Sequence, residues 1–157
     1  MFREVARKNR AIGYDECVQV LKTAKRGVLA VTGDGGYPYA VPLNHFYNEE
    51  DGCLYFHSGK TGHKTDALRA DAKASFCVLD EGEPADDWSY YFRSVIVFGT
   101  AAFIEDRNTV YDISRKLSYK FTDDSEYIEY EITRSGPGTL MFAINIEHMS
   151  GKRVREK

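Results

Sequence analysis

The pattern of hydrophobic and polar positions along this chain predicts many short strands and few helices. Helical spacing is clearest over residues 14–26, where Cys17, Leu21 and Ala24 fall on one face and Asp15 can cap the first turn. Capping residues and spacing predict three further helices, over residues 63–70, after Asp106, and from Asp123 to the Gly136-Pro137 pair.

Strands account for most of the other hydrophobic positions. They are predicted over residues 28–32, 37–47, 53–57, 74–80, 88–104 and 140–147. Gly99 is expected to mark a bulge in the fifth of these. Turn-length connections join the first three strands into a meander, which excludes the helix after nearly every strand that a doubly wound sheet requires. The pattern therefore predicts a mainly β, α+β chain, with an antiparallel barrel at its core and one domain over residues 1–157.

Composition narrows the classes of function. The 157 residues carry a formal charge of −3, which disfavours a general nucleic-acid binder. No apolar run approaches the ~20 residues of a membrane helix, so no membrane association is expected. Three scattered cysteines indicate reduced thiols and a cytoplasmic location, and the histidines and cysteines nowhere have metal-ligand spacing. Aromatic residues make up 13% of the chain, which suits a flat ligand or a subunit interface.

The loop from Ser58 to Lys64 carries the most informative chemistry. It follows a strand, opens a helix, and contains hydroxyl groups and two lysines, all of which favour a phosphate group. Gly59-Lys60-Thr61 also ends the P-loop pattern, but Leu54 stands where that pattern requires glycine, so an NTPase is rejected. The alternative is an ordinary loop with solvated lysines.

Two other strands contain residues that need an explanation. Pro42 lies inside a predicted strand, so either this strand is at an edge or Pro42 faces a ligand instead of a neighbouring strand. Asn44 and His45 would add polar side chains to such a ligand site. Arg93 and Ser94 interrupt an apolar, aromatic strand and need partners if they are buried; Arg93 could form a salt bridge or contact a ligand.

Together these segments resemble the flavin-binding split barrels related to pyridoxamine 5'-phosphate oxidase, and among them the nitroimidazole-resistance-like proteins. The resemblance covers nearly the whole chain and implies a six-stranded antiparallel split barrel with peripheral helices. The motifs that carry it are, in chain order, Arg7-Lys8-Asn9-Arg10, Gly35-Gly36-Tyr37-Pro38-Tyr39, Val41-Pro42-Leu43, Leu54-Tyr55-Phe56-His57-Ser58, Gly62-His63-Lys64, Arg93-Ser94-Val95, Gly99-Thr100-Ala101 and His148-Met149-Ser150-Gly151-Lys152.

The resemblance implies an FMN site, with FAD as an alternative, at the interface of a homodimer. Val41, Pro42, Leu43 and Asn44 would lie along the flavin ring and Ser94 near it. Phe56, His57 and Ser58 would lie along the ribityl chain and the phosphate of the flavin. His63 and Lys64 would bind the phosphate, and Lys60 and Thr61 belong to the same loop.

The expected function is a flavin-dependent oxidoreductase that reduces a small planar electrophile, such as a nitroaromatic compound or a quinone. His45 and His57 are the candidate proton donors. A flavin-binding or flavin-sensing protein without its own substrate is the alternative. Oxidation of vitamin B6 is not expected, because the only tryptophan is Trp88 and the C-terminal segment lacks the Trp and Arg motif of the oxidases.

Overall fold

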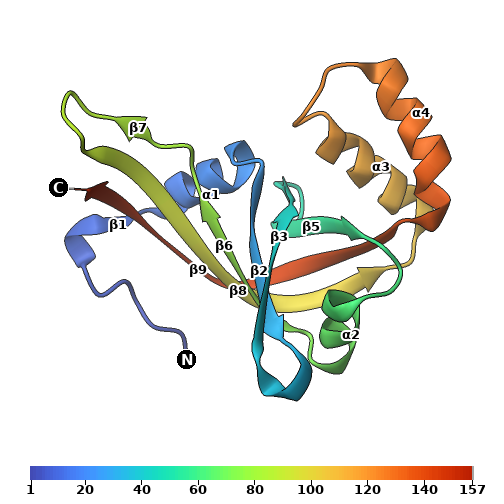
Figure 1. The fold of residues 1–157 in the computed structure, drawn as a ribbon, viewed down its shortest axis with the longest axis horizontal. Helices are drawn as coiled ribbons and strands as arrows, with labels where there is room; N and C mark the ends of the chain where they lie inside the picture. The colour runs from blue at the N-terminus through green and yellow to red at the C-terminus, as the bar shows by residue number, and fades with distance from the viewer. Residues whose placement is uncertain (157) are drawn as a thin grey trace.

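The short hydrophobic runs form the strands of one curled antiparallel sheet, with helices around it (Figure 1). The structure, a computed structural model, describes residues 1–156. In this part of the chain six strands have six or more residues: β2 (Arg26–Thr32), β3 (Pro38–Asn44), β5 (Cys53–Ser58), β6 (Lys73–Leu79), β8 (Tyr90–Ile104) and β9 (Leu140–Glu156). Shorter pairings form β1 (Ala11–Ile12), β4 (Phe46–Asn48) and β7 (Glu83–Pro84).

The order of the strands explains the barrel shape. It is β3-β2-β6-β8-β9-β5-β4, with β1 beside β9 and β7 beside β8, and every pair is antiparallel. β3 and β4 lie at opposite ends of this order, yet only His45 separates them in the chain. The sheet must therefore curl until its two ends meet, which confirms the expected split barrel of the α+β class.

The region expected to be one strand over residues 37–47 is in fact two strands, so the prediction of a simple meander was wrong. β3 pairs with β2, whereas β4 pairs with β5 on the other side of the barrel. The chain changes direction at His45, whose side chain is completely buried. Hydrophobic periodicity does not reveal this change of partner, because both segments remain extended.

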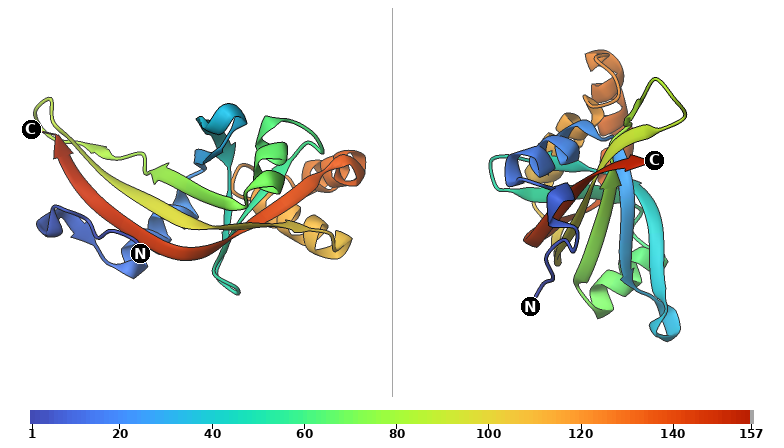
Figure 2. Two further views of the ribbon diagram at one scale, coloured as in Figure 1. Left: turned by 90° about the horizontal axis from the view of Figure 1, so that it is seen from below. Right: turned by 90° about the vertical axis from the view of Figure 1, so that its left-hand side faces the viewer.

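Among the described residues, four helices occupy the outside of the barrel: α1 (Tyr14–Thr23), α2 (His63–Ala70), α3 (Arg107–Ser118) and α4 (Ser125–Ser135). Short 3₁₀ turns occur at Lys8–Arg10, Asp34–Gly36 and Gly136–Gly138. α1 packs against β8 and β9, whereas α3 and α4 pack together at the far end of these long strands (Figures 1 and 2). No helix in residues 1–156 is long and apolar enough to cross a membrane.

The helix ends differ in detail from the expected ones. α1 begins after Gly13 without a side-chain cap, and it ends before Arg26 because Arg26 already pairs with Asn44. Asp106 caps α3 as expected by accepting a hydrogen bond from the Thr109 amide. In α4 the cap is Asp124 rather than Asp123.

The hydrophobic core has two parts, on the two faces of β9. Phe142 and Ile144 point into the barrel, where Phe142 stacks on Phe56 with ring centroids 5.0 Å apart. Met141 and Ala143 point the other way and pack under α3. The alternating pattern of the last predicted strand is thereby explained, because each face of the strand has its own apolar partner.

The paired strands β8 and β9 form a long curved ribbon that extends beyond the barrel (Figure 2). The register shifts between Phe98 and Gly99, which confirms the expected bulge. A Cβ atom at Gly99 would collide with the carbonyl oxygen of Asn145, so the close approach of the two backbones requires glycine. β9 continues to Glu156, well past the predicted end, because its polar second half still pairs with β8.

Candidate cofactor site

The turn between β2 and β3 lies against the start of α2, and His63 joins the two. The His63 ring stacks on Tyr39 with centroids 4.1 Å apart, and its Nε2 accepts a hydrogen bond from the Asp34 backbone amide at 3.1 Å. A Cβ atom at Gly33 would lie 2.8 Å from this nitrogen, so glycine makes room for the ring. These contacts fix the position of the imidazole.

The hydrogen bond to Asp34 also determines which nitrogen of His63 can donate. A backbone amide only donates, so Nε2 is the acceptor and the neutral ring carries its proton on Nδ1. The Asp34 carboxylate lies 3.7 Å from Nε2. His63 can therefore offer an N–H group to an anion while its other nitrogen is held by the turn.

Lys64 and Ser58 meet at the same loop. The Lys64 ammonium group donates to Ser58 Oγ at 2.6 Å, and no ion pair involves Lys64 in residues 1–156. Burial lowers the pKa of Lys64, because the partly desolvated charge has no carboxylate beside it. An anion bound at this point would provide the missing counter-charge.

The first turn of α2 adds backbone donors to these side chains. The first amide groups of a helix have no acceptor inside the helix. The residue before α2 is Gly62, which has a φ of 134° and no side chain to cap those amides. Lys60 and Thr61 lie in the same loop and are exposed. The arrangement brings Ser58, His63 and Lys64 together around an open helix N-terminus, which is a favourable site for a phosphate.

β3 leads away from this loop along a free edge of the sheet. Val41 and Leu43 point toward the core, whereas Pro42 is exposed on the opposite face. Pro42 thus occupies the edge position expected from its missing amide hydrogen. The Asn44 side chain accepts a hydrogen bond from Arg26 Nε at 3.2 Å. A flat ligand could lie along this edge next to the phosphate loop.

Ser94 is not brought to the same place within one chain. The register puts Asn44 beside Arg26 on β2 and puts Ser94 beside Leu79 on β6. Ser94 therefore lies three strands from β3, about 14 Å across the sheet. It borders a cavity of about 510 Å³ that is shared with the N-terminal residues 1–6.

His45 is not placed as a proton donor, contrary to the expectation. Its side chain is completely buried against Phe76, and Nε2 donates to the Leu21 carbonyl oxygen at 2.7 Å. Burial and the nearby Lys120 lower the pKa of His45 to about 4. The ring is thus a neutral core residue, with no path to a substrate.

The positions of Phe56 and His57 limit the roles that these residues can take. The Phe56 side chain is completely buried, so only its backbone can meet a ligand. His57 points to the other face of β5, where it borders a cavity of about 380 Å³ with residues of α3 and α4. Partial desolvation and Lys64 lower the pKa of His57, so the ring is neutral at pH 7 and a poor proton donor.

Arg93 takes the structural role that the sequence left open. Its Nε donates to the Asp80 carboxylate at 2.8 Å, and its backbone amide donates to the same carboxylate. Sequence reasoning missed the contact of Tyr39 with His63 and the hydrogen bond from Arg26 to Asn44. The Tyr37-Pro38-Tyr39 segment after a glycine-rich turn was the only local signal for the first, and no local signal pointed to the second.

Comparisons with known proteins identify the family of the chain and relatives that share its fold. A family model described as pyridoxamine 5'-phosphate oxidase matches residues 14–153. No match is found among curated proteins. Among solved structures, an FAD-binding protein from Mesorhizobium loti is 27% identical, with a TM-score of 0.65, and the match covers 92% of this chain and 97% of that one.

Two further solved structures share the fold at lower identity. A candidate 5-nitroimidazole antibiotic resistance protein from Bacteroides thetaiotaomicron is 21% identical, with a TM-score of 0.76 and coverage of 92% of this chain and 87% of that one. A flavocytochrome from Azotobacter vinelandii is 20% identical, with a TM-score of 0.76 and coverage of 98% and 73% respectively.

Proposed function

Because the chain belongs to the pyridoxamine 5'-phosphate oxidase family, we propose that it is a flavin-binding oxidoreductase with FMN as its cofactor. The substrate would be a small planar electrophile such as a nitroaromatic compound or a quinone. The observation that carries the proposal is that His63 and Lys64 begin α2 behind an uncapped Gly62, with Lys64 bonded to Ser58 and the Nδ1–H group of His63 left to donate. These groups match a phosphate ester in charge and in the kind of donor that they offer.

The free edge of β3 supports the position of the flavin ring. Pro42 is exposed there, so a flat ring can pack on it without breaking a hydrogen bond of the sheet. Bound flavin would supply the electron transfer, and the chain would supply binding and orientation. Since neither His45 nor His57 is placed as an acid, water at the open edge would deliver protons.

Two of the similar structures bear on the substrate class and on the cofactor. One similar structure is described as a candidate 5-nitroimidazole antibiotic resistance protein, and a second as FAD-binding. The second description keeps FAD as an alternative to FMN. A flavin-binding protein without its own substrate is the other candidate function, because the residues around the phosphate loop explain binding but not turnover.

A visible spectrum provides the first test of the cofactor. We expect the purified protein to be yellow, or to become yellow and more heat-stable when FMN is added, since a ligand of the folded state stabilises it. Thin-layer analysis of the compound released by heat distinguishes FMN from FAD. A colourless protein whose melting temperature does not change with either flavin would contradict the proposal. Bound flavin that neither NADH nor NADPH reduces would favour the binding protein without a substrate.

We also propose that the protein is a homodimer with the flavin at its interface. One face of the sheet presents Val28, Ile96 and Phe98, which are 38–40% exposed although they lie mid-strand. The register aligns Val28, Cys77 and Ile96 in one row, next to the row that holds Phe98. Such an apolar sheet face suits contact with a second copy.

Light scattering tests the dimer. We expect a mass of twice 17.9 kDa for the protein, and a fall to 17.9 kDa for the Ile96→Glu variant, because a buried charge disrupts the contact. Tyr130→Glu is the matched control, since Tyr130 is exposed on α4, away from this face. A monomer mass for the flavin-bound, unsubstituted protein at micromolar concentration would exclude the dimer.

A further inference from the structure

One lysine side chain joins two distant parts of the chain at the crossover of the barrel. Lys120 lies in the turn that follows α3, and its ammonium group donates to the carbonyl oxygens of Ala24 at 2.8 Å and His45 at 2.7 Å. Ala24 lies at the end of α1, and His45 separates β3 from β4. Lys120 therefore holds the end of a helix to the point where the chain changes its partner in the sheet.

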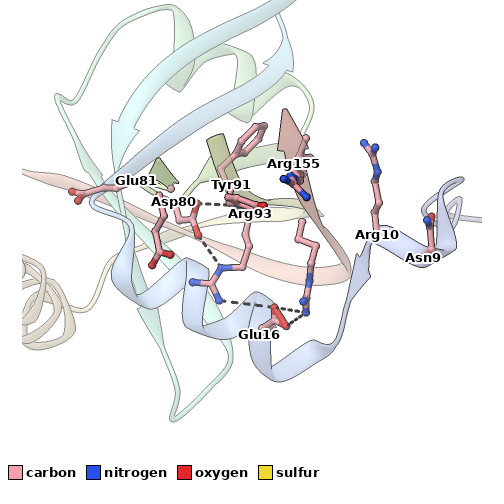
Figure 3. Close-up of a pocket in the computed structure, with 13 residues that line it drawn as sticks. Asn9, Arg10, Glu16, Asp80, Glu81, Tyr91, Arg93 and Arg155 are labelled. Atoms are coloured by element: carbon pink, nitrogen blue, oxygen red, sulfur yellow. Dashed lines mark hydrogen bonds and ion pairs between the residues drawn. The ribbon is translucent and has the colours of Figure 1, made fainter. Parts of the chain in front are cut away.

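The charge of Lys120 has no carboxylate beside it. Arg93 shows how a half-buried cation can be compensated, because Asp80 and Glu16 both lie next to its guanidinium group (Figure 3). Lys120, in contrast, forms no ion pair with any of residues 1–156. Desolvation lowers the pKa of Lys120 to about 8, so that about one amine in ten is neutral at pH 7.

The hydrogen bonds of Lys120 suit a neutral amine as well as an ammonium ion. A neutral amine keeps two N–H groups, and the carbonyl oxygens of Ala24 and His45 accept both of them. No other acceptor among residues 1–156 contacts this nitrogen, so loss of the third proton breaks no hydrogen bond within that part of the chain. The lost proton leaves a lone pair, which is what makes an amine a nucleophile.

Lys120 also borders a pocket of about 260 Å³ between α1, β4 and α3. The other two lysines of this pocket are paired, since Lys22 Nζ lies 2.8 Å from Glu49 and Lys116 Nζ lies 3.9 Å from Glu50. The volume is below the common range of small-molecule sites, about 300–1,000 Å³, and therefore suits a small group rather than a cofactor. An anion would pair with the ammonium form of Lys120, whereas an uncharged electrophile can meet the neutral amine.

We propose that Lys120 is an acylation site, whose neutral amine attacks small uncharged activated acids such as anhydrides or thioesters. The lone pair of the nitrogen forms a bond to the carbonyl carbon of the acid. The bond from that carbon to the leaving oxygen or sulfur breaks, the leaving atom keeps the electron pair, and one proton passes from the nitrogen to water. The resulting amide keeps one N–H group, which can still donate to Ala24 or His45, and it removes a partly desolvated charge that no carboxylate compensates.

Competitive labelling of the purified protein with a trace of acetic anhydride tests this proposal. Lys116 is the matched control, because it borders the same pocket one helical turn earlier but has its pKa raised by a hydrogen bond to Asp112 at 3.0 Å. Mass spectrometry after digestion should show that Lys120 is acetylated at least about tenfold faster than Lys116 at pH 7. Equal rates, or a slower rate at Lys120, would overturn the proposal. The labelling does not require flavin, so its result does not depend on the proposed cofactor.

The same labelling in concentrated urea controls for the local sequence. Unfolding removes the contacts of Lys120 with Ala24 and His45 and returns the nitrogen to water. Lys120 and Lys116 should then be acetylated at equal rates. If Lys120 still reacts faster in urea, the folded arrangement is not the cause of its reactivity and the proposal is wrong.

The dependence on pH identifies the group that reacts. The charged or titratable side chains around Lys120 are Lys22 on α1, Lys25 after this helix, His45 at the crossover, Tyr47 on β4, Glu49 and Glu50 in the following turn, and Lys116 on α3. The rate at Lys120 should level off above about pH 8, whereas the rate at Lys116 should continue to rise. His45 does not contribute to this change, because its pKa of about 4 keeps it neutral throughout. Rates that rise in parallel to about pH 10 would contradict the proposal.

Discussion

Replacing Lys64 by Ala is expected to weaken FMN binding by roughly 10- to 100-fold and to leave riboflavin binding nearly unchanged. Lys64 donates to Ser58 beside the open start of α2, and its partly buried charge has no carboxylate partner among the described residues. A charge-assisted hydrogen bond to the phosphate would contribute about 1.5–3 kcal/mol, which corresponds to this loss of affinity. Riboflavin has no phosphate and should not respond. Quenching of flavin fluorescence measures both affinities.

Lys60→Ala provides the charge-matched control in the same loop. Lys60 is exposed, so solvent screens its charge and its removal should weaken FMN binding much less. If the two lysine variants lose affinity equally, a general positive potential rather than a defined phosphate contact explains the binding. If Lys64→Ala weakens FMN and riboflavin to the same extent, Lys64 supports the fold and the assignment of the phosphate loop is wrong.

Acidification from pH 6.5 to pH 4 is expected to reduce the free energy of unfolding by about 3 kcal/mol through His45 alone. The pKa of His45 is lowered from 6.5 to about 4 in the folded protein, mainly because the ring is buried. Between these values the unfolded chain binds a proton that the folded chain excludes, so stability falls as the pH falls. Below about pH 4 both states are protonated and the loss is complete. Urea unfolding at a series of pH values measures this slope.

A His45→Gln variant should flatten the pH dependence in this range, since an amide can still donate to the Leu21 carbonyl oxygen but does not titrate. His57→Gln is the comparison, because the pKa of His57 is lowered in the same direction but its side chain is exposed. The unsubstituted protein gives an independent readout by nuclear magnetic resonance. If every histidine of the folded protein titrates above pH 5.5, the buried neutral state of His45 is disproved.

Local patterns were enough to predict much of the fold. The proline in β3 and the glycine at the bulge of β8 each restrict the backbone in a way that the residue type alone reveals. Non-local pairing was not predictable in the same way. The second half of β9 is polar and charged, yet it is a strand because β8 pairs with it and Glu16 lies between Arg93 and Arg153.

In the candidate site, too, the features set by local sequence were predictable and those set by distant contacts were not. The phosphate loop is a continuous segment before a helix, so its hydroxyl groups, lysines and glycine could be interpreted together. The role expected for His45 depended on exposure, which is a property of the folded chain. His45 is buried by Phe76, and Lys120 donates to its carbonyl oxygen from a distant part of the sequence. A polar residue in a strand gives no sign of such surroundings.

The central place of β9 has a consequence for how the chain folds during synthesis. β9 pairs with β8 and β5 and also with β1, so it joins segments that the ribosome produces much earlier. Until β9 has emerged, β8 and β5 each keep an unpaired edge, and unpaired edges are where chains associate with one another. Contacts between distant parts of a sequence also form slowly. The nascent chain should therefore depend on protection from aggregation until its last strand inserts between two strands that are already made.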